Sequence, residues 1–278
     1  MAKSDFKIKF WGVRGSLPVP GKDTCKYGGN TACVEVRCGD KLLILDAGSG
    51  IRELGNSLMK ELPIEANILF SHLHWDHIQG FPFFTPAFMA ENKINLFAEK
   101  KLNKTFESLM SGQMMYPHFP ISLKDLDAHI TFNELEYGDE VNFGKVTVKT
   151  SRNNHSDGCI AFRVEYKKKS FVYATDTEHY ACIDPILSNT AKNADYLIYD
   201  ATYTNDEYSG KNGSPKTGWG HSTWQEGVRL AQCANVKNLV LFHHDPEHTD
   251  KVLTKIEKDA QKEFKNTIAA YEGLEIYL

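Results

Sequence analysis

One short segment constrains the fold more than any other, because it places four possible metal ligands within six residues. His72, His74, Asp76 and His77 lie directly after an apolar, strand-like run at 66–70. Side chains two residues apart on an extended chain point the same way, so His72 and His74 can converge on one cation. Asp76 and His77 follow where the chain turns, and they can reach a second position nearby. Such crowding of imidazole and carboxylate groups is costly without a cation and predicts a site for Zn, Mn or Fe.

The hydrophobic pattern predicts several strands and fewer helices. The expected strands are 6–10, 33–36, 41–46, 66–70, 145–150, 160–166, 170–174, 196–199 and 238–242. The expected helices are 51–61, about 222–233, and one that carries the apolar stripe Leu253, Ile256, Ala260 and Phe264. Residues 81–130 are less regular, aromatic and interrupted by prolines, which is typical of a lid-like insertion. We expect one domain, 1–278, built from sheets with outer helices.

Charge and hydropathy limit the classes of partner. The chain has 32 lysines and arginines against 36 aspartates and glutamates, a net charge of −4, which argues against a broad electrostatic grip on nucleic acid. No apolar run approaches the roughly 18 to 20 residues that a membrane span needs. The N-terminal residues lack the apolar core of a secretory signal. We therefore expect a cytoplasmic protein with no membrane partner.

Three later residues complete a pattern around the segment 72–77. His155, Asp176 and His243 each adjoin a strand-like run. With them, His-x-His-x-Asp-His after a buried strand resembles the metallo-β-lactamase superfamily. The resemblance implies an α/β fold, an αββα four-layer sandwich with two mixed β-sheets flanked by helices, and two divalent metal ions. It assigns one metal to His72, His74 and His155, the other to Asp76, His77 and His243, and a bridging position to Asp176.

A second motif narrows the resemblance to one branch of the superfamily. Gly220-His221-Ser222-Thr223, followed by a helix and a strand, is similar to the phosphodiesterase branch that includes the tRNA 3′-processing endonuclease ribonuclease Z. The resemblance places His221 near the metals and pairs it with an acidic residue, here Asp200. Asp200 would orient His221, which would stabilise a phosphoryl oxygen or protonate the leaving alkoxide. His221, Asp200 and Asp76 are thus the candidate catalytic residues. The alternative role for His221 is to cap the helix that follows it.

Three other polar residues receive lesser roles. His244 is the alternative to His243, which is preferred because the apolar strand ends there. Asp46 is expected to support a ligand rather than bind a metal. His248 could line the pocket, and the sequence leaves open whether it contacts the substrate.

The chain departs from ribonuclease Z in two places. Between Tyr166 and Tyr196 there is no long basic segment comparable with the arm by which that enzyme grips its RNA. Instead, aromatic residues and methionines gather after Gly80, and with Trp75 they resemble small bacterial relatives of cyclic-nucleotide phosphodiesterases. These side chains are Phe81, Phe83, Phe84, Met114, Met115, Tyr116, His118 and Phe119. They could stack on a nucleobase above the metals, or form a hydrophobic plug under a lid.

The expected function is that of a dinuclear metal-dependent phosphodiesterase. Its substrate would be a small phosphodiester, first a 3′,5′-cyclic nucleotide such as cAMP, attacked by a hydroxide held between Zn, Mn or Fe ions. Extended nucleic acid is not expected as a partner, and the resemblance allows a homodimer. The alternatives are a ribonuclease Z-like nuclease, a lactone, lactam or thioester hydrolase, and a non-catalytic metal-binding sensor module. The pair of His221 and Asp200 argues against the second alternative, and the complete ligand set against the third.

Overall fold

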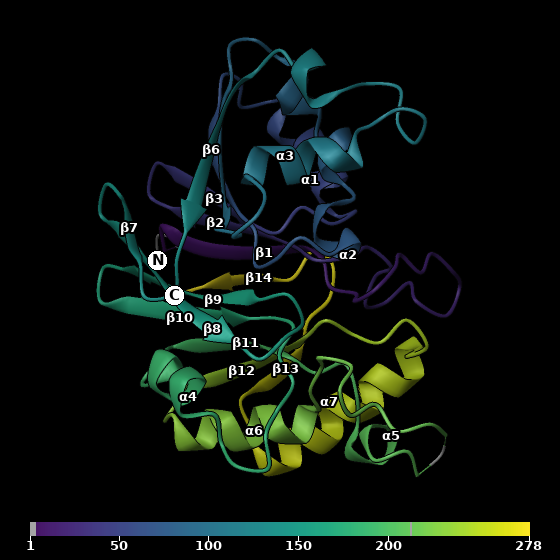
Figure 1. The fold of residues 1–278 in the computed structure, drawn as a ribbon. Coiled ribbons are helices and arrows are strands. Elements are labelled where there is room, and N and C mark those ends of the chain that lie inside the picture. Colours follow the sequence, from purple (N-terminus) through teal and green to yellow (C-terminus); the bar gives the residue numbers. More distant parts are fainter. Residues whose placement is uncertain (1–3, 212) are drawn as a thin grey trace.

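The computed structural model describes residues 4–211 and 213–278, which form two seven-stranded sheets between layers of helices (Figure 1). The first sheet has the order β14 (Glu275–Tyr277), β1 (Phe6–Gly12), β2 (Cys33–Cys38), β3 (Lys41–Leu45), β4 (Glu65–Leu69), β5 (Lys93–Glu99), β6 (His129–Leu135). The second has the order β13 (Thr267–Ala269), β12 (Asn238–Phe242), β11 (Tyr196–Asp200), β10 (Lys169–Ala174), β9 (Cys159–Tyr166), β8 (Val146–Asn153), β7 (Glu140–Phe143).

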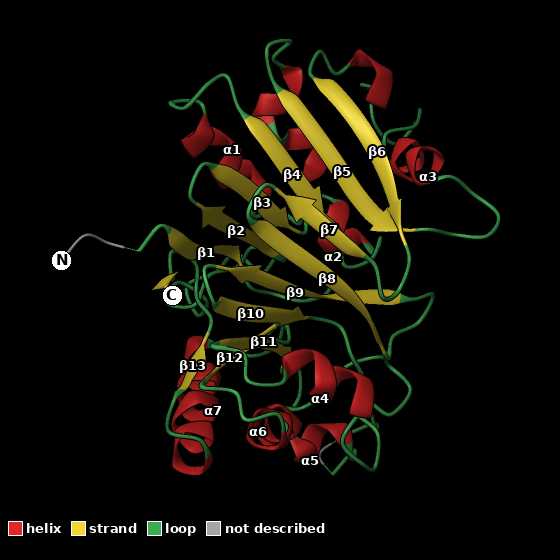
Figure 2. Ribbon diagram, turned by 90° about the vertical axis from the view of Figure 1, so that its left-hand side faces the viewer, coloured by secondary structure: helices red, strands yellow, loops and turns green. Residues whose placement is uncertain are grey.

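Both sheets are mixed, as the resemblance predicted. Strands β3 to β6 pair in parallel, whereas β14, β1, β2 and β3 pair antiparallel. In the second sheet β10 to β13 are parallel and β7 to β10 antiparallel. The facing sides of the two sheets share one apolar core, with Phe10 and Leu45 from one sheet and Phe162 and Phe242 from the other. Figure 2 shows the two sheets one above the other, with strands of both running toward a common edge.

Helices cover the outer face of each sheet. On the first sheet lie α1 (Ile51–Leu58), α3 (Phe106–Gln113) and the short elements α2 (Trp75–Ile78), η1 (Phe81–Phe83), η2 (Thr85–Phe88) and η3 (Leu123–Asp125). On the second lie α4 (Pro185–Ala191), α6 (Trp224–Cys233) and α7 (Asp250–Glu263), with α5 (Asn205–Tyr208) near one end. Each layer has its own apolar cluster against the sheet, so the four-layer αββα sandwich is confirmed. None of the described helices is both long and apolar enough to cross a membrane.

The segment expected to be a lid-like insertion contains more of the core than its irregular sequence indicates. Strand β5 is an inner strand of the first sheet, and its buried side chains Ile94, Leu96 and Ala98 alternate in the usual way. The prolines and aromatic residues on either side obscure that short alternation. Phe81 and Phe84 are fully buried in the cluster under the helices, as a hydrophobic plug requires.

The topology brings the chemistry-bearing residues to one edge. Strands β4, β8, β10, β11 and β12 all end at this edge, and the loops that follow them carry the predicted site residues. Parallel strands present their carboxyl ends on the same side of a sheet, which is where such folds place their sites. Because the two sheets share a core, the loops of both sheets bring their candidate ligands to the same place at this edge.

Candidate metal centre and active site

The structure brings all seven predicted metal ligands together in two adjoining groups. His72 and His74 lie on the extended segment after β4, and Asp76 and His77 in α2. The donor atoms of each group all lie within 4.8 Å of one another. The predicted ligands form two of these groups: one is His72, His74 and His155, and the other is Asp76, His77, Asp176 and His243. Two further groups of possible ligands include His221, one with His155 and Asp176 and one with Asp200 and His243.

Asp176 reaches both groups from the end of β10. Its Oδ1 lies 3.2 Å from Nε2 of His77, and its Oδ2 lies 3.3 Å from Nε2 of His243. The same Oδ2 is 3.7 Å from Nε2 of His72 and 3.9 Å from Nε2 of His155. This agrees with the position between two metals that the family resemblance implies for Asp176, and the bridging role itself stays a prediction.

The chemistry of the donors fits divalent metal ions. Nε2 of His72 is buried and has no hydrogen-bond partner among the described residues. Nitrogen atoms of different imidazoles face each other, at 3.2 Å for His74 and His155 and at 3.3 Å for His77 and His243. A buried set of imidazole and carboxylate donors is stable when a cation is shared between them.

Burial and the neighbouring charges set the protonation of these groups. Desolvation lowers the pKa of His72, His74 and His155, which favours the neutral imidazole that binds a metal. Burial alone would raise the pKa of the Asp76 and Asp176 carboxyls. The surrounding histidines outweigh it, so both pKa values are lowered and both groups are carboxylates.

Asp46 holds His77 in place and is not itself in a ligand group. Its Oδ2 accepts a hydrogen bond from Nδ1 of His77 at 2.8 Å, which leaves Nε2 facing the other ligands. The same carboxylate accepts bonds from the Ser71 amide and hydroxyl and from the Tyr173 hydroxyl. A carboxylate behind a metal-binding imidazole sets its tautomer and its direction. The expected supporting role of Asp46 agrees with this geometry, but nothing in the sequence indicated Tyr173.

The loops around the site hold strained backbone. Ser16, Asp46, Asp176 and His243 all have φ between 52° and 63°, in the left-handed region that non-glycine residues seldom occupy. The Ser16 amide donates to Oδ2 of Asp76 at 2.7 Å, so one strained residue positions the carboxylate of another element. Strain of this kind persists where surrounding structure fixes it and gathers at functional sites.

Glycine is required at positions 15 and 220 because the imidazole rings of two candidate metal ligands lie against the backbone there. A Cβ on Gly15 would lie 2.3 Å from the His243 ring, and a Cβ on Gly220 would lie 2.3 Å from Nδ1 of His155. The Gly220 carbonyl accepts a hydrogen bond from that same Nδ1 at 2.7 Å. The motif that contains His221 therefore also orients a ligand of the first group.

We expect Asp46→Asn to weaken metal binding by about 10- to 100-fold, because the amide no longer holds His77 as a charged acceptor does. Tyr173→Phe, which removes one partner of Asp46, should have a smaller effect in the same direction. Metal affinity measured by competition with a chromogenic chelator checks both. Tyr166→Phe is the matched control, since that hydroxyl bonds Asp5 far from the site. Equal affinities for all four proteins would show that Asp46 does not support the centre.

His221 lies beside both ligand groups and is anchored by Asp200. Its ring centre is 4.9 Å from that of His243 and 5.3 Å from that of His155. Its Nδ1 bonds Oδ2 of Asp200 at 2.9 Å. Burial opposes the charged form of His221, but Asp200 and the other carboxylates outweigh it and raise its pKa to about 9. Thr223, not His221, caps helix α6.

Thr202 links Asp200 to a ligand, a contact that the sequence analysis missed. Its hydroxyl donates to Oδ1 of Asp200 at 2.7 Å and lies 3.1 Å from Nδ1 of His243. The signal was its place two residues after Asp200, at the end of β11. A hydroxyl there can orient the carboxylate and the ligand ring together.

The remaining candidates lie outside the two ligand groups. His244 bonds the Ala270 carbonyl through Nε2, so the preference for His243 agrees with the geometry. His248 is buried and bonds Glu207 at 2.9 Å. Trp75 and Tyr116 are 80% and 89% exposed and do not line the cavity next to the ligands.

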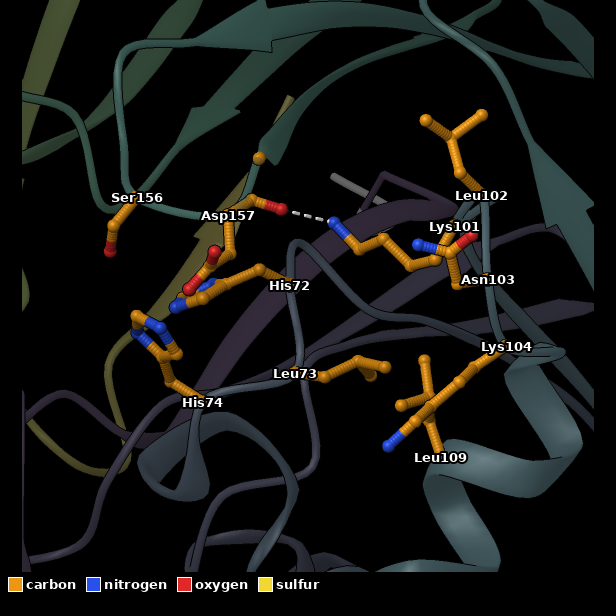
Figure 3. A pocket seen from close by; sticks show the side chains of 11 residues that line it. His72, Leu73, His74, Lys101, Leu102, Asn103, Lys104, Leu109, Ser156 and Asp157 are labelled. Atoms are coloured by element: carbon orange, nitrogen blue, oxygen red, sulfur yellow. Dashed lines mark hydrogen bonds between the residues drawn. The ribbon is translucent and has the colours of Figure 1, made fainter.

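A cavity of about 380 Å³ opens beside His72 and His74 (Figure 3). Its walls come from the segment after β5, from α3 and from the loop that follows His155. It is lined by leucines and lysines rather than by the aromatic residues expected to stack on a base. The cavity adjoins two of the candidate metal ligands, and small molecules bind preferentially in concave sites of this kind.

Comparisons with known proteins agree with this fold. The model of the Beta-lactamase superfamily domain matches residues 42–244. A ribonuclease Z of Thermoplasma acidophilum is 23% identical, over 98% of this chain and 96% of that protein. The metallo-beta-lactamase fold protein YhfI of Bacillus subtilis has a TM-score of 0.74 at 19% identity and covers 99% of both chains. A diphosphatase of the PhnP family has a TM-score of 0.71 at 17% identity, with 98% of both chains covered.

The matched region runs from β3 to just past β12 and includes all seven ligand candidates as well as Asp200 and His221. The ribonuclease Z likeness extends over nearly the whole chain. The superfamily predicted from the motifs is thereby confirmed: the chain belongs to the beta-lactamase superfamily.

Proposed function

We propose that the chain is a metal-dependent phosphodiesterase that hydrolyses a small phosphodiester, with a 3′,5′-cyclic nucleotide such as cAMP as the first substrate to test. The coarser activity, metal-dependent hydrolysis of a phosphoester bond, is supported by the family and by its ribonuclease Z relatives. The observation that carries the proposal is the placement of His221, held by Asp200 against both ligand groups. A proton donor at this point is what the departure of an alkoxide requires.

Two divalent ions, Zn, Mn or Fe, would be held by the two ligand groups. His72, His74 and His155 would hold one ion and Asp76, His77 and His243 the other, with Asp176 in reach of both. When bound, the ions supply positive charge for the phosphoryl oxygens and lower the pKa of water at the site. The protein then needs no cluster of arginines there, which agrees with its net charge of −4.

The role proposed for the pair of Asp200 and His221 is to protonate the leaving group. Asp200 accepts the hydrogen bond from Nδ1 of His221, so Nε2 is the ring nitrogen left to exchange a proton. Burial opposes the charged form of His221, but Asp200 and the neighbouring carboxylates outweigh it and favour a proton on the ring by raising its pKa. That proton can pass from Nε2 to the departing oxygen, and Asp200 stabilises the ring in the correct direction throughout.

The substrate is proposed to be small for two reasons. The cavity beside His72 and His74 has a volume of about 380 Å³, near the lower end of the usual range for small-molecule sites. The chain between Tyr166 and Tyr196 forms a hairpin turn, strand β10 and helix α4, with no projecting arm in that described range. Both features favour a mononucleotide over a folded RNA.

The test is the hydrolysis of cAMP by protein loaded with Mn or Zn, followed by chromatography of the products. We expect adenosine monophosphate to form, and the product to disappear with Asp76→Ala, because that carboxylate belongs to a ligand group. If the protein cleaves an aryl phosphodiester but not cAMP, the phosphodiesterase activity is supported and the cyclic nucleotide is rejected as the substrate. If neither diester is cleaved by metal-replete protein, the phosphodiesterase proposal fails.

A ribonuclease activity is the second candidate, because the curated relatives that cover most of the chain carry the name ribonuclease Z. Binding of a long polyanion weakens steeply with salt and strengthens with RNA length, since phosphate contacts release counterions. Affinity for RNA of several lengths, measured at two salt concentrations, decides between the candidates. A steep dependence on both would favour the nuclease over the small-molecule enzyme.

A further inference from the structure

The cavity beside His72 and His74 has a lining that is unusual for a phosphate site (Figure 3). Three leucines, Leu73, Leu102 and Leu109, supply its apolar walls. Leu102 is fully exposed, so its side chain is not buried against any other part of the chain. An apolar group beside a polar centre is expected to be covered by part of a ligand.

Asp157 and Lys104 are charged groups of the cavity that each form one kind of hydrogen bond, whereas Asn103 and Ser156, which also line it, can both donate and accept. The Asp157 carboxylate lies on the same side as His72 and can only accept hydrogen bonds. The Lys104 ammonium can only donate, and its side chain runs past Leu109 (Figure 3). No hydrogen bond or ion pair of the Lys104 ammonium occurs within the described parts of the chain. Lys101, by contrast, is held by Glu99 and by the Asp157 carbonyl.

Resting on the proposed function, we propose that this cavity binds the nucleoside part of the substrate. The base lies against Leu102 and Leu109, an amino or hydroxyl group donates to Asp157, and a ring nitrogen or carbonyl accepts from Lys104. An alkyl or lipid group would leave Asp157 and Lys104 without partners, and a sugar alone would leave the leucines uncovered. A second phosphate is disfavoured because it would lie near the Asp157 carboxylate.

The position of the cavity agrees with this assignment. It borders His72 and His74 but is not lined by His221. A nucleoside bound there places its phosphate toward the ligand groups and keeps the side of His221 free for the leaving oxygen. The volume of about 380 Å³ suits one nucleoside and excludes a base-paired helix.

The experiment compares two diesters that share a leaving group and a charge. Thymidine 5′-(p-nitrophenyl phosphate) carries a nucleoside, whereas methyl p-nitrophenyl phosphate carries only a methyl group. We expect wild-type protein loaded with Mn to prefer the nucleoside ester at least about tenfold in kcat/KM. The variants Leu102→Asp and Lys104→Ala should reduce this ratio about tenfold. Both residues are exposed, so both variants should fold.

A matched control and a binding measurement complete the design. Lys124→Ala removes another exposed lysine of the same region that does not line the cavity, and it should keep the wild-type ratio. Equilibrium dialysis with radiolabelled thymidine monophosphate gives a readout that does not depend on turnover. We expect binding to weaken about tenfold in Leu102→Asp and Lys104→Ala but not in Lys124→Ala.

The outcomes separate the inference from the proposed function. Equal cleavage of both esters by wild-type protein, or an unchanged ratio in both cavity variants, overturns the nucleoside assignment and leaves the phosphodiesterase in place. Cleavage of neither ester overturns the phosphodiesterase, and dialysis then decides the cavity. Nucleotide binding that is lost in the cavity variants supports the assignment, whereas binding that is absent or unaffected overturns it.

Discussion

Asp176→Asn should reduce hydrolysis of any phosphodiester substrate by more than about 10³-fold. This carboxylate lies within 3.9 Å of an imidazole nitrogen in each of His72, His77, His155 and His243, so its loss disturbs both ligand groups. Loss of several kcal/mol of charge stabilisation in the transition state corresponds to a factor of this size. Asparagine has nearly the same shape and tolerates the left-handed backbone that Asp176 adopts at φ 52°.

The measurement is kcat/KM together with the metal content of the purified protein. We expect the variant to fold, to retain fewer metal equivalents than the wild type and to lose activity at every metal concentration tested. Asp195→Asn is the matched control, because that buried carboxylate pairs with Lys169 and Lys237 at the far ends of the strands. Full metal content and full activity in Asp176→Asn would contradict the bridging position.

His221→Ala should lower hydrolysis by about 10²- to 10⁴-fold for a diester with an alkoxide leaving group, the usual range for a general acid. A diester with a p-nitrophenolate leaving group should lose much less, because this good leaving group departs without a proton. The contrast between the two substrates is the test, since damage to the fold or the metals would lower both alike. Equal losses on both substrates would contradict proton transfer from His221 to the leaving group.

The control for His221 is a histidine of similar exposure close by. His179 is half-buried and lies 3.1 Å from the Ser222 hydroxyl, next in sequence to His221, but it belongs to neither ligand group. His179→Ala should therefore leave the leaving-group dependence unchanged. Asp200→Asn should act in the same direction as His221→Ala, because it weakens the bond that directs the His221 ring.

The sequence, through its motifs and the superfamily they resemble, predicted the superfamily and the layered fold, and it named residues that the structure brings together. His72, His74, Asp76 and His77 are local in sequence, so their spacing on a strand end already indicates where they point. His155, Asp176 and His243 could be named because the family that the motif resembles has two later histidines and an aspartate, and this chain supplies each of them beside a strand-like run. The hydrophobic periodicity did not predict strand β5, because the alternation of Ile94, Leu96 and Ala98 is short and lies among prolines and aromatic residues.

Only the tertiary structure decided what surrounds those ligands. The bond from Tyr173 to Asp46 joins residues 127 positions apart, and the contact of Gly15 with His243 joins opposite ends of the chain. The cavity walls likewise come from three separate segments, so Leu102 and Asp157 carry no signal in their own neighbourhoods. Periodicity and spacing report on neighbours along the chain, whereas the shape of a substrate site depends on contacts between segments that meet only after the two sheets have packed together.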